Sequence, residues 1–176
     1  MADRKIASLT MHDASGVDAA SEPRAAPSIP DPRSSILALE RVRASFSRQG
    51  AMMLIGARIV ALEPGYCALA LTPRPEVSQQ HGYVHAGILA TLVDSAGGYA
   101  GYTLFPADSS VLTVEFKLNL LAPAQGERIV AEGFVVKSGR TLTITRGEVH
   151  AERAGSRTLV ALMQQTLMVM RGKPDA

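Results

Sequence analysis

The stretch HGYVHAGILATLVDSAGGYAGYTLF, from His81 to Phe105, predicts one long, apolar, glycine-rich helix over about Ala86 to Leu104. Asp94 carries its only formal charge at neutral pH, and an ionised carboxylate is costly to bury without a partner. On a helical wheel, Asp94 shares a face with the small residues Ala90, Gly97, Gly98 and Gly101. We interpret this face as one approached closely by another backbone, a partner subunit or a ligand, and Asp94 as a candidate general base or nucleophile.

The sequence on both sides of this helix is β in character. Two strands joined by a turn at Glu63-Pro64-Gly65 are predicted over 53–73, and four more strand candidates with short turns follow the helix. A short extra helix is expected from about Pro32 to Gly50, with Asp31 or Ser34 as its cap. The economical solution is an α+β fold in which a curved antiparallel sheet, ending in a four-stranded meander, wraps around the long helix.

Composition and charge limit the function classes. The chain has 176 residues, 47% of them hydrophobic, 19% charged, and a formal net charge of +2, which describes one globular domain with no requirement for nucleic acid. Residues 1–33 are rich in Ala, Ser and Pro and lack the apolar core of a signal peptide, so we expect a flexible extension before a domain over 34–176. The central charge and glycines of the long helix argue against a membrane span, and we expect a cytoplasmic protein.

Four histidines and one cysteine are available for chemistry. His81 and His85 have a spacing that binds metal on a helix, but Gly82 interrupts any helix there. His12 and His150 offer no evident third ligand, so we predict no metal site and expect His85 to order the loop. Cys67 lies in an apolar strand-like run and is interpreted as a small buried hydrophobe.

The beginning of the long helix, His85-Ala86-Gly87, presents free backbone N–H groups and the positive end of the helix dipole, which can hold a developing oxyanion. Asp94 lies about 12–14 Å away at 1.5 Å per residue, too far to act with that end within one subunit. Two helices paired antiparallel across a two-fold axis would bring Asp94 of one subunit to the Ala86 N–H of the other. The sequence therefore predicts a dimer.

Three segments together carry a family resemblance. HGYVHAGILATLVDSAGGYA, followed by VLTVEFKLNLLAPAQGE and VVKSGRTLTI, resembles the hotdog-fold acyl-CoA thioesterases, in the PaaI-type branch of the 4-hydroxybenzoyl-CoA thioesterase superfamily. The similarity covers roughly 51–170. It implies a hotdog fold with Asp94 as general base or nucleophile and Ala86 as the backbone oxyanion donor.

The resemblance also implies roles for other residues. The polarising amide falls on Gln79 and the hydroxyl that supports the attacking water on Thr113, while His85 and Gly87 flank the donor. Contacts with the CoA phosphates fall on the turn formed by Lys137, Ser138, Gly139 and Arg140. It further implies a homodimer that assembles into a homotetramer.

The expected function is hydrolysis of aryl- or medium-chain acyl-CoA, as in phenylacetic acid degradation, with CoA as part of the substrate and no separate cofactor. Two alternatives stay open at this point. One is a hotdog hydratase or dehydratase acting on acyl thioesters, with His85 and Asp94 at the reacting carbon. The other is a non-catalytic module that binds acyl-CoA.

Overall fold

The computed structural model describes residues 32–173 and 175. In chain order the elements are α1 (Pro32–Arg48), α2 (Gly50–Ile55), β1 (Arg58–Glu63), β2 (Tyr66–Leu71), the 3-10 turn η1 (Pro75–Val77), α3 (Ala86–Tyr102), β3 (Ser109–Leu120), β4 (Arg128–Lys137), β5 (Leu142–Arg153) and β6 (Ser156–Arg171).

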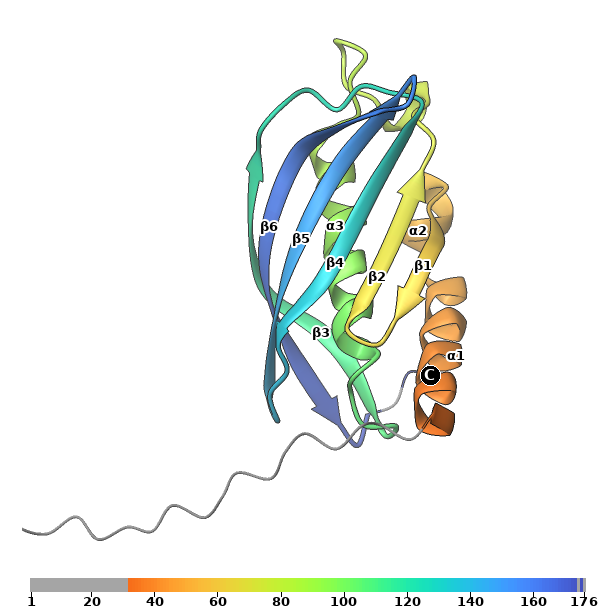
Figure 1. Ribbon diagram of the computed structural model, residues 1–176, viewed down its shortest axis with the longest axis vertical. Coiled ribbons are helices and arrows are strands. Elements are labelled where there is room, and N and C mark those ends of the chain that lie inside the picture. The colour runs from red at the N-terminus through yellow and green to blue at the C-terminus, as the bar shows by residue number, and fades with distance from the viewer. Residues whose placement is uncertain (1–31, 174, 176) are drawn as a thin grey trace, which may run out of the picture.

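One six-stranded sheet, with the order β1-β2-β4-β5-β6-β3, curves around α3 (Figure 1). Every neighbouring pair of strands is antiparallel. The helix packs against the inner face of the sheet, and its residues from Leu89 to Tyr102 are buried except on one side near Ala90, Thr91 and Asp94. The predicted α+β hotdog fold, with a long helix as its core, is therefore confirmed.

The predicted meander of four late strands is wrong in one respect. Strands β4, β5 and β6 follow one another as neighbours, but β3 lies beyond β6, at the edge of the sheet opposite β1. A short turn was expected over 122–126, but the segment over 121–127 instead crosses the end of the sheet to reach β4 (Figure 1). The backbone N–H groups of Leu121 and Ala122 donate to the Val160 carbonyl, and the Val84 N–H donates to the Ala124 carbonyl. These hydrogen bonds hold the connection along the end of the sheet, so it does not fold back as a hairpin.

The N-terminal helical region differs from expectation at its boundaries. Helix α1 begins at Pro32, inside the expected extension 1–33, and the rest of that extension and the Asp31 cap lie outside the described residues. Gly50, expected to end the helix, instead starts the short helix α2, which ends at Gly56 with a left-handed φ of 72°. The first strand accordingly begins only at Arg58. No helix in the described part of the chain is both long and apolar enough to cross a membrane.

Helix α1 is fastened to the far end of α3 by one side chain. The guanidinium of Arg41 donates to the carbonyl oxygens of Tyr102, Phe105 and Pro106, and it stacks over the Tyr102 ring at 4.3 Å. The Tyr102 carbonyl lies at the C-terminal, negative end of the α3 dipole, where a cation is favourable, and the other two carbonyls follow directly after the helix. The attachment holds the last turn of α1 beside the middle of α3.

Candidate functional site

Asp94 lies in the middle of α3 with one carboxylate oxygen held by neutral donors. The Thr113 hydroxyl donates to Asp94 Oδ1 at 2.9 Å, and the Gln165 amide donates to the same oxygen at 2.6 Å. Oδ2 makes no hydrogen bond to any residue that the structure describes. One oxygen is thus fixed in place while the other is available to a water or a substrate.

The electrostatics of Asp94 follow from its surroundings. Burial raises the pKa of the carboxyl above its ordinary value, and the hydrogen bonds from Thr113 and Gln165 oppose that rise without cancelling it. No salt bridge joins Asp94 to a cation within the described residues. A carboxylate with a raised pKa is suited to accept a proton from water near neutral pH.

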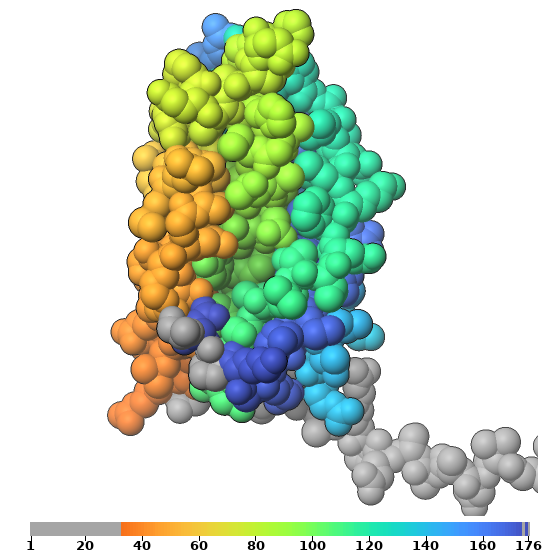
Figure 2. Space-filling view, turned by 180° about the vertical axis from the view of Figure 1, so that it is seen from behind, coloured from red at the N-terminus to blue at the C-terminus, as the bar shows by residue number. Residues whose placement is uncertain are grey.

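Asp94 opens onto a pocket of about 520 Å³. It lies along α3, in the groove that separates α1 and α2 from β3 (Figure 2). One wall, Val111 and Leu112 of β3, is apolar. The side facing α1 is polar and is lined by Ser45, Arg48, Gln49, Ser95 and Tyr99.

A second pocket, of about 360 Å³, lies at the beginning of α3. Gln79, Tyr83, His85 and Ala86 contribute to its lining. The His85 side chain caps the helix by accepting a hydrogen bond from the Gly87 N–H at 2.9 Å, so the Gly87 N–H is engaged. The Ala86 N–H donates to no acceptor in the described residues and stays available to a ligand.

Gln79 is held in a tight turn beside that helix end. Its backbone N–H donates to the Tyr83 carbonyl at 2.8 Å, and its side-chain oxygen accepts from the His81 N–H at 2.5 Å. Gly82 sits in this turn with φ of 82°, as the sequence suggested when it excluded a continuous helix. The amide of Gln79 therefore lies at the Ala86 pocket and not at the Asp94 pocket.

The site residues expected from the sequence thus fall into three separate places within one chain. Asp94 and Thr113 lie together, while Gln79, His85, Ala86 and Gly87 lie at the helix N-terminus, about 12 Å away along the axis. The exposed turn from Lys137 to Arg140 lies between β4 and β5, at the opposite end of the sheet. Within one chain, His85 and Asp94 do not meet.

The small residues beside Asp94 have a different explanation from the one the sequence suggested. A Cβ on Gly97 would lie 2.1 Å from Gln165 Oε1, and one on Gly101 would lie 2.5 Å from Leu167 Cδ1. Strand β6 of the same chain, and not a second backbone or a ligand, fills the space over these two glycines. Only Gly98 lines the open pocket.

Sequence reasoning missed Gln165 and Thr145. Both are fully buried on the inner face of the sheet, and the Thr145 hydroxyl donates to Gln165 Oε1 at 2.7 Å. A signal was present, because strict alternation along β6 places Gln165 on the same face as Met163 and Leu167. The contact with Asp94 was not predictable, since it depends on which strand lies over the helix.

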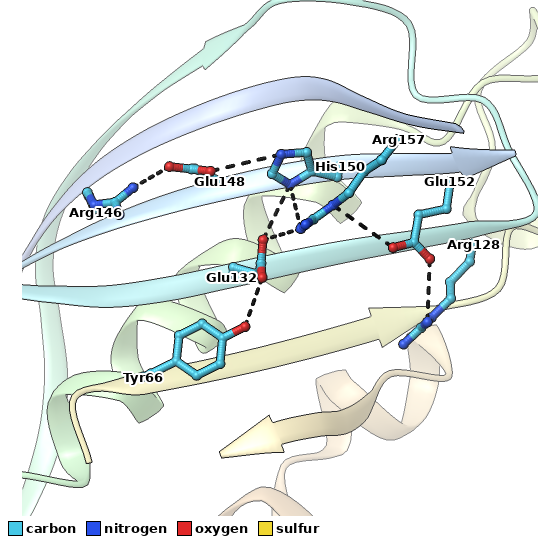
Figure 3. A network of polar contacts seen from close by, with 8 residues as sticks. All are labelled: Tyr66, Arg128, Glu132, Arg146, Glu148, His150, Glu152 and Arg157. Carbon is cyan, nitrogen blue, oxygen red and sulfur yellow. Dashed lines mark hydrogen bonds and ion pairs between the residues drawn. The ribbon is translucent and has the colours of Figure 1, made fainter. Parts of the chain in front are cut away.

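The outer face of the sheet carries a separate polar network (Figure 3). Glu132 accepts hydrogen bonds from Tyr66 and Arg157, and His150 lies 3.5 Å from Glu132 and 3.9 Å from Glu148. Glu132, Glu148 and His150 have the residue types of a metal site and lie close enough together for one. The Arg157 guanidinium already contacts both Glu132 and His150, so the geometry is that of an ion-pair network.

Comparisons with known proteins agree with this architecture. The model of the thioesterase superfamily matches residues 81–157. A thioesterase family protein from Silicibacter pomeroyi is 46% identical, and the match covers 77% of this chain and 99% of that protein with a TM-score of 0.76. The Escherichia coli PaaI protein from the phenylacetic acid degradation operon has the same fold at 18% identity, with a TM-score of 0.70 over 79% of this chain and 97% of that one.

A curated relative is more distant. A protein of Saccharolobus solfataricus that carries the provisional name esterase SSO2140 is 30% identical over 91 residues, which are 52% of this chain and 64% of that protein. The match thus spans just under two thirds of that relative. The resemblance seen in the sequence is confirmed by the family model and by the structure from Silicibacter pomeroyi: this chain belongs to the thioesterase superfamily.

Proposed function

We propose that this protein hydrolyses acyl-CoA thioesters, with Asp94 as general base or nucleophile. The observation that carries the proposal is a partly buried carboxylate, held on one oxygen by neutral donors and open on the other to a pocket. Asp94 would take a proton from water as it attacks the thioester carbonyl, or would attack that carbonyl itself to form an anhydride. In the first route, protonated Asp94 returns its proton to the departing CoA thiolate. In the second route, the CoA thiolate leaves first, and a water then cleaves the anhydride, which releases the free acid, regenerates Asp94 and supplies the proton for the thiol.

The oxyanion donor in this proposal is the Ala86 N–H of a second copy of the chain. Within one chain, about 12 Å of helix separates Ala86 from Asp94, whereas both must lie within a few ångströms of one carbonyl. A two-fold axis that pairs the α3 helices antiparallel would bring the two together. The Gln79 amide and His85 would then orient the thioester from the same side as Ala86.

The free edge of the sheet supports such a dimer. Within the residues that the structure describes, strand β3 has no neighbour on its outer side, and its side chains Leu112, Val114, Phe116 and Leu120 are each about half exposed. Natural proteins seldom leave a long apolar edge strand uncovered. We propose that β3 meets β3 of a second copy, and that such dimers pair into a tetramer.

The proposed dimer also gives the basic turn a role. Antiparallel pairing would bring the turn from Lys137 to Arg140 of one chain toward the Ala86 end of the other. Lys137 and Arg140 are exposed there and could bind the phosphates of CoA. We propose a cytoplasmic location because acyl-CoA would be the substrate.

The pocket lining bears on the acyl group. Five polar side chains, from α1, α3 and the Gln49 position between α1 and α2, face two apolar residues of β3. This lining favours an aryl or medium-chain acyl group that carries a polar substituent over a plain alkyl chain. A hydrolysis panel of phenylacetyl-, hydroxyphenylacetyl-, benzoyl- and octanoyl-CoA, followed by detection of the free thiol, tests the substrate. Absence of thiol release from every member would contradict the proposed activity.

A mixing experiment tests the composite site. Asp94→Asn and Gln79→Ala each disable one half, so each homodimer should be nearly inactive. If the halves come from different chains, dimers re-formed from an equal mixture should contain one intact site in every mixed dimer and recover roughly a quarter of wild-type activity. Activity no higher than the mean of the two separate variants would contradict a shared site.

A further inference from the structure

Gln165 is a long polar side chain in a place where burial is nearly complete. It lies on the inner face of β6, paired with Thr145 of β5 on one side and with Phe116 of β3 on the other, and it is 1% exposed. Buried polar groups are nearly always hydrogen-bonded, and an unpaired one is destabilising. The partners of Gln165 therefore indicate why an amide occupies a core position.

The contacts fix which end of the amide faces the helix. Gln165 Nε2 lies 2.6 Å from Asp94 Oδ1, 3.1 Å from the Asp94 carbonyl oxygen and 3.1 Å from Thr113 Oγ1. A carbonyl oxygen and an ionised carboxylate can only accept, so the NH₂ end must face Asp94. Gln165 Oε1 then faces Thr145, whose hydroxyl donates to it at 2.7 Å. A flipped amide would place its oxygen against the Asp94 carboxylate and carbonyl oxygens, which cannot donate to it.

Gly97 makes room for this arrangement. A Cβ atom at position 97 would lie only 2.1 Å from Gln165 Oε1 and 3.0 Å from Thr145 Oγ1. Glycine is therefore the residue that leaves space for the amide. The amide consequently packs directly on the helix backbone, one turn beyond Asp94. Sheet, amide and helix form one rigid support.

We infer that Gln165, with the far end of its amide anchored by Thr145, is the positioning residue that holds Asp94 Oδ1 and leaves Oδ2 free for the reacting water. The inference rests on the proposed function for its catalytic meaning, while the support itself lies within one chain. Gln165 does not touch the proposed path of the thioester. It acts through Asp94.

Charged groups near Asp94 come from few elements. The three strands over Asp94 present only neutral groups toward it, namely Thr113 of β3, Thr145 of β5 and Gln165 of β6. The titratable or charged groups at the same pocket are Arg48 of α1, Tyr99 of α3 and Asp175. Arg48 is paired with Asp175 at 3.8 Å. The Gln165 amide is thus one of two side-chain donors that stabilise the charged form of Asp94. Losing it would raise the pKa of Asp94 further and move the acid limb of the pH–rate profile to higher pH.

Thr145→Val is the sharpest test, because it removes only the hydroxyl that anchors the far end of the amide, and Thr145 does not touch Asp94. We expect kcat to fall by about tenfold with KM changed less than twofold, and the acid limb of kcat/KM to move to higher pH. Gln165→Met, which keeps the length and removes the donor, should give a larger effect in the same direction. Thr145→Ser should restore the wild-type profile.

Gln164→Leu is the matched control, since Gln164 is the exposed neighbour on the opposite face of the same strand. It should leave kcat and the acid limb unchanged. If Thr145→Val lowers the melting temperature but keeps the wild-type kcat and acid limb, Gln165 is only structural and the inference is wrong.

A second readout does not depend on turnover. The carboxyl carbon of Asp94, followed by ¹³C NMR, should titrate at higher pH in Thr145→Val than in wild type, whatever substrate the protein uses. An unchanged titration would overturn the inference. Failure of the wild-type protein to hydrolyse acyl-CoA would instead count against the proposed function alone.

Discussion

The carboxylates on the two sides of the sheet have opposite surroundings. On the inner face, Asp94 meets only neutral donors, and its pKa is raised by burial. On the outer face, Glu132 is paired with the Arg157 cation, and Glu148 is paired with Arg146 (Figure 3). A carboxylate that is paired with a cation is stabilised in its charged form, whereas Asp94 has no such partner in the part of the chain that the structure describes and takes up a proton more readily. The contrast separates a carboxylate suited to catalysis from carboxylates that stabilise the fold.

Strand alternation creates this contrast one residue at a time. Thr145 faces Gln165 inside, while the next residue, Arg146, lies outside over the Phe134 ring at 4.1 Å. Gln165 is buried and Gln164 is exposed. Because successive side chains of a strand point to opposite faces, the same two strands support the candidate site and the surface network.

Among the substitutions that test this contrast between the two faces, Gly97→Ala should have the largest effect on hydrolysis. Its added methyl group would occupy the position of Gln165 Oε1 and push the amide away from Asp94. We expect hydrolysis to fall by about tenfold or more, while Gly50→Ala, whose methyl group would meet nothing within 4 Å, leaves hydrolysis unchanged. Wild-type hydrolysis by folded Gly97→Ala would show that the inner support is dispensable.

On the outer face, Glu132→Gln should lower stability and not activity. The change weakens the contacts with Tyr66, Arg157 and His150, and we expect a loss of about 1–2 kcal/mol in the free energy of unfolding. The pKa of Tyr66, which burial and Glu132 together raise to about 12, should fall as well. Denaturant unfolding measures the first and ultraviolet titration the second. A loss of kcat beyond about twofold would break the proposed division between the faces.

The smallest expected effect is a pH dependence of stability. Burial raises the pKa of folded Asp94 above its unfolded value, so the folded state binds the proton more tightly and is destabilised as pH rises between the two pKa values. Asp94→Asn removes that penalty. The stability of Asp94→Asn relative to wild type should therefore increase from acid to neutral pH in paired denaturant titrations. A relative stability that falls with pH would mean that a favourable charge interaction had been lost.

The sequence predicted the features that depend on local pattern. The long helix, the lone acid within it and a curved antiparallel sheet wrapped around the helix followed from the apolar run, the position of Asp94 and the flanking strands, and the family resemblance identified this arrangement as a hotdog fold. The order of the strands was not predictable, because the segment over 121–127 has the length and composition of a turn and yet crosses the sheet. The boundary at Gly50 was missed because glycine commonly ends a helix and here begins one.

Only part of the candidate site could be predicted from the sequence. Asp94 is conspicuous because it is a charge in an apolar helix, and Thr113 came from the family resemblance. The sequence explained Gly97 by the close approach of another backbone, a partner subunit or a ligand, whereas the structure explains it by the Gln165 amide. Contacts of this kind depend on three-dimensional packing between segments about 70 residues apart, which no local pattern encodes.

The most direct test of Asp94 as the catalytic carboxylate is the pH profile of kcat/KM for wild type and Asp94→Asn on the best acyl-CoA substrate. We predict that wild-type activity falls on acidification with an apparent pKa above the ordinary carboxyl value, and that Asp94→Asn is at least about a hundredfold slower throughout. An Asp94→Asn protein that hydrolysed the substrate at the wild-type rate, with the same acid limb, would contradict the account.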